Sequence, residues 1–213
     1  MGAVLDMDGL MFDTENLTYK LQREFLLKEG KNFSLEDYKK TVGKRAADLP
    51  EYFKTLFGNS FSYEDFHQKC RTVYVQYTEA HGVPIKDGLF ELLDFLKSKN
   101  IKTALATSTT RRSAERTLKI AKVFDYFDAL VCAEDVENGK PSPEPFLKAA
   151  QKLGLPPENC LALEDSFNGI ISAASAGMVT VMIPDLIEPT DDIKGKCTFI
   201  LKNLKDVVRL IDE

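Results

Sequence analysis

Apolar residues recur every three or four positions from about residue 14 to residue 82, as at Leu17, Leu21 and Phe25. This is the spacing of one face of a helix, and no stretch in this part of the chain alternates as a strand does. We therefore predict about four or five helices here, packed together into a small bundle.

A different pattern covers the rest of the chain. Short apolar runs alternate with helical patterns from about residue 83 onward, and one more apolar run, Ala3 to Leu5, precedes the bundle. Such alternation predicts a parallel sheet covered by helices. The expected strands are 3–5, 101–106, 129–132, 160–163, 179–183 and a weaker one at 197–201. The expected fold is α/β, with a Rossmann-like parallel sheet and helices on both faces in residues 1–13 and 83–213. The helical bundle, residues 14–82, is then an insertion after the first strand.

Composition narrows the class of protein. The 213 residues are 44% hydrophobic and 29% charged, which suits a soluble globular chain with one substantial core and a small second domain. A formal net charge of −5 argues against a nucleic-acid binder. No run of about 18 apolar residues predicts a membrane span, and no signal peptide is recognisable, so we expect a cytoplasmic protein. The four isolated cysteines are expected to be reduced, and the chain to be a monomer.

Two carboxylates directly follow the first expected strand. Side chains two positions apart in an extended segment point the same way, so Asp6 and Asp8 are expected to face one spot. Gly9 then turns the chain at the carboxyl end of the strand, where ligands bind in open α/β sheets. By itself, Asp-x-Asp-Gly is as typical of an ordinary turn. Three later stretches of the sequence favour a ligand-binding site over an ordinary turn.

Two of these stretches offer groups that bind an anion. Thr107 and Ser108 follow the expected strand 101–106 and precede a helix, where hydroxyls and backbone N–H groups hold phosphates. Lys140 follows the next expected strand and would neutralise charge shared by a phosphate and the carboxylates. The alternatives are that Ser108 or Thr110 only caps its helix and that Lys140 is a solvated surface residue.

The third stretch supplies two more acids. Glu164 and Asp165 follow the expected strand 160–163, and acids at the end of a core strand are destabilising unless they are paired or bind a metal. With Asp6 and the backbone carbonyl of Asp8 they would form an oxygen-only site, which suits Mg²⁺ with retained waters. The alternative is that they only cap the following helix.

The motifs together resemble those of haloacid-dehalogenase (HAD) superfamily phosphatases that have an α-helical cap inserted after the first strand. The branch of interest contains β-phosphoglucomutase-like and pseudouridine-5′-phosphatase-like proteins. The resemblance covers nearly the whole chain, and it makes residues 14–82 a cap domain. The matching segments, in the family's order, are Asp6-Met7-Asp8-Gly9, Thr107-Ser108, Lys140-Pro141-Ser142-Pro143 and Leu163-Glu164-Asp165-Ser166-Phe167-Asn168-Gly169.

The resemblance implies roles for these residues. Asp6 becomes the nucleophile that forms an aspartyl-phosphate, and Asp8 the general acid and base. Mg²⁺ is implied as cofactor, bound by Asp6, the Asp8 carbonyl and Asp165, with Glu164 in support. The residues implied to hold the transferring phosphoryl group are Thr107, Ser108 and Lys140.

The same comparison separates reaction classes. Dehalogenases have no use for a second acid such as Asp8, and the Asp-Lys-Thr-Gly-Thr motif of transport ATPases is absent. The favoured activity is hydrolysis of a small phosphate monoester, a sugar or nucleoside monophosphate. A β-phosphoglucomutase-like phosphomutase is the alternative, but such mutases carry a His shortly after the Asp-Thr, and Asp13-Thr14 is followed here by Glu15-Asn16-Leu17-Thr18. A non-catalytic binding protein with this fold would be expected to have lost a motif residue, and none is lost.

Two residues of the bundle are further candidates. Lys44 and Arg45 follow Gly43 in the segment expected to touch the substrate, where either could reach an anionic or hydroxyl-rich leaving group. The equally weighted alternative is that both are ordinary exposed surface charges.

Overall fold

The structure is a computed structural model that describes residues 1–44 and 46–212, and it separates into two compact units. One unit contains residues 1–13 and the chain from residue 83 onward. The other contains residues 14–82. Within the described residues, no helix combines the length and the apolar character needed to cross a bilayer.

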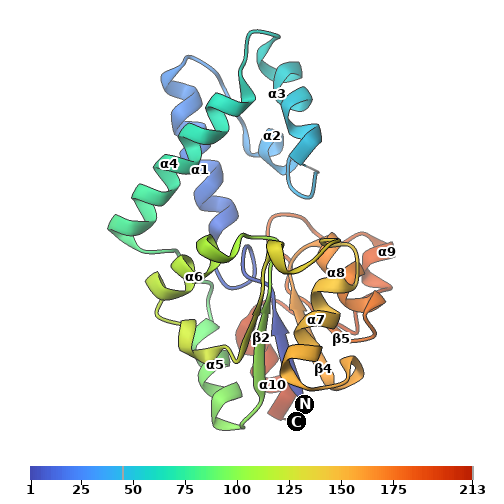
Figure 1. The fold of residues 1–213 in the computed structure, drawn as a ribbon. Coiled ribbons are helices and arrows are strands. Elements are labelled where there is room, and N and C mark those ends of the chain that lie inside the picture. The colour runs from blue at the N-terminus through green and yellow to red at the C-terminus, as the bar shows by residue number, and fades with distance from the viewer. Residues whose placement is uncertain (45, 213) are drawn as a thin grey trace. The chain divides into compact units, whose positions relative to one another are not determined.

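The first unit is built on a sheet of parallel strands in the order β3-β2-β1-β4-β5-β6 (Figure 1). The strands are β1 (Gly2–Leu5), β2 (Lys102–Ala106), β3 (Ala129–Val131), β4 (Cys160–Glu164), β5 (Val179–Met182) and β6 (Phe199–Ile200). This arrangement confirms the predicted α/β class. The order reverses beside β1, and such a reversal is where ligands bind in doubly wound sheets.

Successive residues of β1 enter different cores because side chains alternate across a sheet. Ala3 and Leu5 belong to one buried cluster, which contains leucines of α5, α6 and α10. Val4 belongs to the other, with Phe146 and the small residues of α7 and α8. The sheet is therefore covered on both faces. The helices of this unit are α5 (Leu89–Ser98), α6 (Arg111–Ile120), α7 (Glu144–Leu153), α8 (Phe167–Ser175), α9 (Asp191–Lys194) and α10 (Leu204–Asp212).

Register aligns the carboxyl ends of the central strands. Leu5 of β1 is paired with Leu105 of β2 and with Leu163 of β4. The residues that follow these three positions therefore leave the sheet at one edge. Asp6 is among them, and its N–H donates to the carbonyl of Leu163 at 3.0 Å.

The second unit consists of helices packed on an aromatic core. The centroids of the buried Phe33 and Phe53 rings lie 5.5 Å apart, and those of Phe53 and Phe66 lie 5.2 Å apart. A capping box at Ser34 begins one of the helices. The helices are α1 (Thr14–Lys28), α2 (Leu35–Lys39), α3 (Leu49–Phe57) and α4 (Tyr63–His81), with a 3₁₀ turn, η1 (Ala46–Asp48).

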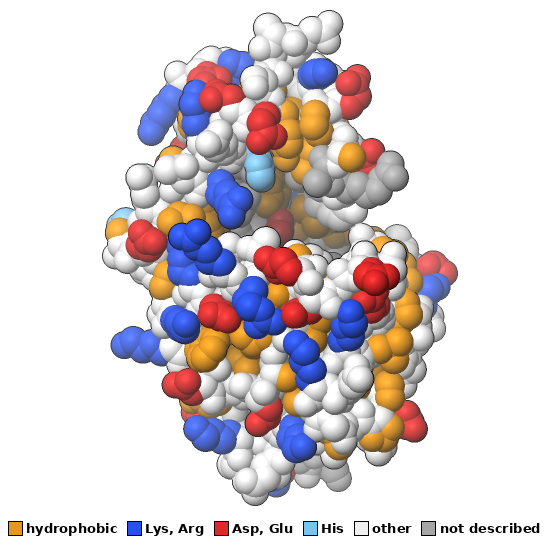
Figure 2. All heavy atoms as spheres, viewed as in Figure 1, with side chains coloured by type: hydrophobic (Ala, Val, Ile, Leu, Met, Phe, Trp, Pro, Cys, Tyr) orange, Lys and Arg blue, Asp and Glu red, His pale blue; other side chains and the backbone are white. Residues whose placement is uncertain are grey.

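Most expected strands differ from the observed ones by one residue at an end, as is usual where the ends of elements fray. The largest difference is the weak strand 197–201, which is reduced to Phe199–Ile200 at the edge of the sheet. On the face drawn in Figure 2, charged side chains of both signs are interspersed over the surface of the sheet-containing unit. This mixture agrees with the small net charge.

Candidate active site

The first acidic motif lies where β1 ends. Asp6 is 7% exposed, and Met7 points into the hydrophobic core. Met7 lies in the same buried cluster as Ala3 and Leu5, whereas Asp6 contacts other partners. Asp8 is half-buried, and its Oδ2 accepts a hydrogen bond from the hydroxyl of Thr109 at 2.8 Å.

Gly9 allows the chain to pass close to a second strand. Its φ of +84° lies in the left-handed region, and a Cβ at this position would overlap the carboxylate of Asp165. Its N–H donates to the carbonyl of Phe12 at 2.9 Å, which closes the turn. Glycine is required here both by the backbone angle and by the approach of Asp165.

Lys140 is buried among three acceptors. Its Nζ lies 2.5 Å from Oδ1 of Asp6, 2.6 Å from Oε1 of Glu164 and 2.9 Å from the carbonyl oxygen of Ala106. An ammonium has three hydrogens, so each has one acceptor. The side chain is 6% exposed, which rules out the alternative that Lys140 is a solvated surface residue.

The loop before Lys140 is held by the first residue of α7. The carboxylate of Glu144 accepts the backbone N–H groups of Glu137 and Asn138, both at 2.9 Å. Lys148, one turn along the helix, lies 2.7 Å from the same carboxylate. These bonds fix the path of the chain that leads to Lys140.

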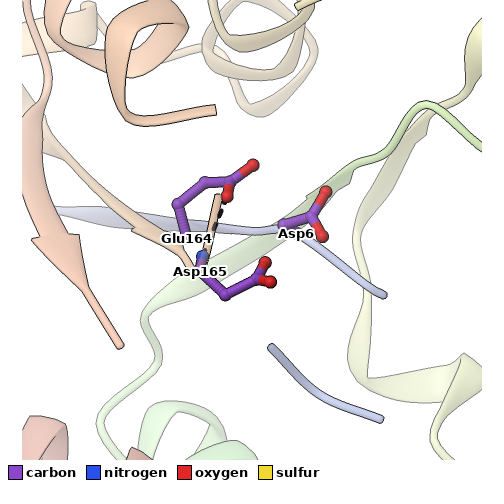
Figure 3. Close-up of side chains that lie close together, drawn as sticks. All are labelled: Asp6, Glu164 and Asp165. Carbon is purple, nitrogen blue, oxygen red and sulfur yellow. Dashed lines mark hydrogen bonds between the residues drawn. The ribbon is translucent and has the colours of Figure 1, made fainter. Parts of the chain in front are cut away.

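Glu164 is the last residue of β4 and Asp165 follows it, and Figure 3 shows their side chains and that of Asp6 gathered in one small region. Oε2 of Glu164 accepts the backbone N–H groups of Asp165 (2.8 Å) and Ser166 (2.7 Å). The following helix is capped by Ser166, whose hydroxyl accepts the N–H of Gly169. The two acids are therefore not the side-chain caps of α8.

Burial changes the proton affinity of this cluster. It raises the pKa of Asp6 to about 7, since the lowering effect of Lys140 is smaller and the charge of Glu164 adds to the rise. It also raises the pKa of Asp165 well above its usual value, and the nearby charge of Glu164 contributes. Burial by itself would lower the pKa of Lys140, but the carboxylates of Asp6 and Glu164 raise it above the ordinary value.

The cluster fits a hard divalent cation. Asp6, Glu164 and Asp165 each offer a carboxylate oxygen, and these oxygens lie within 4.8 Å of one another. Oδ1 of Asp165 is buried and has no hydrogen-bond partner, which is destabilising unless a ligand satisfies it. An all-oxygen donor set is the one that Mg²⁺ prefers.

The expected anion site after β2 is more complex than predicted. Thr107 is 4% exposed, and its hydroxyl accepts the N–H of Thr109 at 3.1 Å, whereas Ser108 is exposed. Thr110 precedes α6, but no side-chain hydrogen bond caps the helix there. Thr109, which contacts Asp8, is a site residue that the sequence analysis did not identify. The run of four hydroxyl residues after the strand, to which Thr109 belongs, could have indicated it.

Of the two candidates in the helical unit, the structure describes one. Lys44 is exposed, and its Nζ lies 5.7 Å from the centre of the Tyr52 ring. Arg45 lies outside the described residues. The structure thus groups Asp6, Lys140, Glu164 and Asp165, and joins Asp8 to the loop after β2.

Comparisons with known proteins give consistent results. A family model described as haloacid dehalogenase-like hydrolase matches residues 1–177. The phosphorylated carbohydrates phosphatase of Thermotoga maritima is 34% identical over 181 residues, which span 83% of this chain and 81% of that protein. The "probable pseudouridine-5′-phosphatase" of Drosophila melanogaster is 35% identical over 192 residues, 86% of this chain and 81% of that protein. A crystal structure of a "putative beta-phosphoglucomutase" from Thermotoga maritima has a TM-score of 0.83 at 29% identity and covers 100% of this chain and 99% of that one.

Proposed function

The chain belongs to the haloacid dehalogenase-like hydrolase family, as its motifs indicate, and we propose that it is a Mg²⁺-dependent phosphatase acting on small phosphate monoesters. The relatives named as phosphatases support hydrolysis of phosphoric monoesters. The observation that carries the proposal is the buried Lys140 between Asp6 and Glu164, beside an Asp165 oxygen that has no protein partner.

Asp6 is the proposed nucleophile. A carboxylate oxygen of Asp6 forms a bond to phosphorus while the bond from phosphorus to the leaving oxygen breaks, which gives an aspartyl-phosphate and an alcohol. Lys140 holds one oxygen of Asp6 in place and favours its ionised form. Burial opposes ionisation, so the lysine is needed for reactivity.

Asp8 is the proposed general acid and base. It gives a proton to the leaving oxygen in the first step and takes a proton from water in the second. That water oxygen bonds to phosphorus as the phosphorus–Asp6 bond breaks, which releases inorganic phosphate and restores Asp6. The hydroxyl of Thr109, which donates to Oδ2 of Asp8, orients this carboxyl group.

Asp6, Asp165 and the backbone carbonyl of Asp8 would hold the cation, with Glu164 in support. A bound Mg²⁺ supplies charge neutralisation, so that an anionic phosphate can approach the Asp6 carboxylate. Thr107, Ser108 and Lys140 are proposed to hold the phosphoryl group. All three hydrogens of Lys140 already have protein acceptors, so contact with phosphate requires the exchange of one of them.

The substrate is proposed to be a sugar or nucleoside monophosphate, since the relatives' names mention phosphorylated carbohydrates and a pseudouridine-5′-phosphatase. Lys44 and Arg45 are proposed to contact the leaving group. Substitution of either by Ala should then raise KM for the natural ester more than for p-nitrophenyl phosphate. The cytoplasmic location and the monomeric state stay predictions.

The activity test is hydrolysis of p-nitrophenyl phosphate with Mg²⁺. Activity should be lost with EDTA and in Asp6→Asn, and kept in Asp94→Asn, whose carboxylate contacts only Tyr126 among the described hydrogen bonds. Unchanged activity in Asp6→Asn would refute the nucleophile assignment. A panel of phosphate monoesters ranked by kcat/KM would then identify the substrate class.

A phosphomutase is the second candidate, because the similar crystal structure from Thermotoga maritima is named as a β-phosphoglucomutase. The absence of a His after Asp13-Thr14 favours hydrolysis. The two activities differ in product: a mutase converts one sugar phosphate isomer into another and releases little free phosphate. Stoichiometric release of phosphate from a sugar monophosphate supports the hydrolase.

A further inference from the structure

A second group of charges lies at the same edge of the sheet. The ammonium of Lys86 contacts Oδ1 of Asp185 and lies 3.3 Å from Oδ1 of Asp13. Backbone bonds fix the two chain segments involved, since the N–H of Lys86 donates to Met11 and the N–H of Asp13 donates to Pro84. The described structure therefore holds Lys86 between two acids.

Asp185 follows β5, the strand beside β4. β5 is the neighbour of β4 in the sheet (Figure 1), and the N–H of Ile183 donates to the carbonyl of Glu164 at 2.8 Å. Asp185 follows two residues later, so it lies beyond the same end of the sheet as Asp165.

One oxygen of Asp185 lacks a donor. Its side chain is 7% exposed, Oδ1 contacts Lys86, and Oδ2 is buried without a hydrogen-bond partner. Oδ1 of Asp165 is in the same situation. Buried carboxylate oxygens without donors are strongly disfavoured, so a group that donates hydrogen bonds to them would stabilise this arrangement.

Asp185 is not positioned as a direct ligand of the cation. Among the described residues, the ligand oxygens that lie within 4.8 Å of one another belong to Asp6, Glu164 and Asp165, and Asp185 is not in that set. Mg²⁺ keeps several of its waters in proteins, and each of these waters donates hydrogen bonds to residues around it. A water of this kind would supply what Oδ2 of Asp185 lacks.

We propose that Asp185 is a positioning residue for the metal site, whose Oδ2 accepts a hydrogen bond from a water of the cation held by Asp6 and Asp165. Lys86 orients the carboxylate by binding its other oxygen. Asp185 thereby raises cation affinity without being a ligand. This inference rests on the proposed metal-dependent function.

The test is Mg²⁺ binding to the full chain by calorimetry, without substrate. In Asp185→Asn, Lys86 would keep the amide oxygen, and an NH₂ group, which only donates, would replace Oδ2. Loss of such an outer partner typically weakens metal binding about 10- to 100-fold, and we expect that range here. Asp13→Asn is the matched control, because it removes the same charge beside the same lysine; its dissociation constant should stay within about twofold of wild type, as only screened charge changes there.

Several results would overturn the inference. Equal weakening in Asp13→Asn would assign the effect to net charge, and an unchanged dissociation constant in Asp185→Asn would remove the proposed bond. A fall in melting temperature with unchanged Mg²⁺ affinity would make Asp185 purely structural. If Asp185→Asn does not fold, Asp185→Ala is measured in its place with the same expectation. Failure of the wild-type chain to bind Mg²⁺ would instead refute the metal-dependent function itself.

Discussion

Nζ of Lys140 lies 2.6 Å from Oε1 of Glu164, and the two side chains are 6% and 1% exposed. The same ammonium binds Asp6, so one buried cation neutralises two acids from the ends of β1 and β4. Such buried ions stabilise a fold only when all of them are present, because removal of one leaves another charge buried without a partner and without access to water.

Lys140→Met should therefore destabilise the protein as well as inactivate it. Removing one member of a buried ion pair typically lowers the free energy of unfolding by about 3–5 kcal/mol. Urea denaturation of the metal-free protein measures the change. Lys148→Met is the control: its pair with Glu144 is partly exposed, so its removal should change the free energy of unfolding far less. Equal effects of the two substitutions would contradict the buried-pair account.

Gly9→Ala should weaken metal binding. The added Cβ would overlap the Asp165 carboxylate and displace it, which we expect to weaken Mg²⁺ affinity at least about tenfold, as changes beside ligands do. Gly154→Ala isolates the backbone effect, because Gly154 also has a positive φ but no atom would lie within 4 Å of an added Cβ there. It should cost about 1–2 kcal/mol of stability and leave Mg²⁺ affinity unchanged. Calorimetry and thermal unfolding distinguish the two effects.

Mg²⁺ affinity should depend on pH through Asp6. The pKa of this carboxyl is raised to about 7 without metal, and a cation binds only the ionised form. The affinity should thus fall at least about tenfold per pH unit as the pH drops below about 7, because protonation of Asp165, whose pKa is also raised, adds to the effect of Asp6. Titrations across this range should also show proton release on binding. A pH-independent dissociation constant would show that Asp6 is already ionised.

Glu144 should stabilise the Lys140 loop only when ionised. The Lys148 ammonium and the N–H groups of Glu137 and Asn138 lower its pKa from 4.5 to about 2. Because the folded pKa lies below the unfolded one, the stabilisation is present above pH 4.5 and is lost as the pH falls toward 2. Glu144→Gln should then have a lower melting temperature than wild type near neutral pH, and the difference should shrink on acidification. A constant difference would speak against this ion pair.

Thr109→Val should slow turnover without affecting Mg²⁺ binding. It removes the hydroxyl that donates to Asp8, so the proposed acid and base loses one of the groups that orient it, and we expect kcat to fall about tenfold. Thr109→Ser keeps a hydroxyl and should restore most of the rate. Thr110→Val is the control, because the Thr110 hydroxyl bonds to Ser113 instead. Steady-state kinetics that show no difference between Thr109→Val and wild type would exclude the role.

The local pattern of apolar and polar residues was sufficient to predict the helices and strands, and the motifs were sufficient to indicate the family. Alternation of apolar runs with helical spacing predicted most of the strands to within about one residue, since burial of a sheet's two faces requires that pattern. The positions of Asp6, Glu164 and Asp165 after strands were also readable, and parallel strands place their carboxyl ends at one edge. The roles of these residues and of the helical unit as a cap remain predictions.

The hydrogen-bond partners of individual side chains could not be predicted from the local sequence pattern. Thr109 donates a hydrogen bond to Asp8, and Glu164 binds Lys140 and two backbone N–H groups. Which hydroxyl in a run points inward depends on the turn after the strand, and that turn is set by packing against neighbouring segments.

The amino-acid sequence by itself determined the α/β class, the inserted helical segment and the acids that end the strands, because periodicity and residue type are local properties of the chain. Only the tertiary structure decided that Lys140 is buried between Asp6 and Glu164, and that Asp185 and Asp165 each keep a buried oxygen without a donor. Burial and hydrogen bonding depend on segments that are distant in the chain. They bring charged side chains out of water and next to one another, which forms the candidate active site.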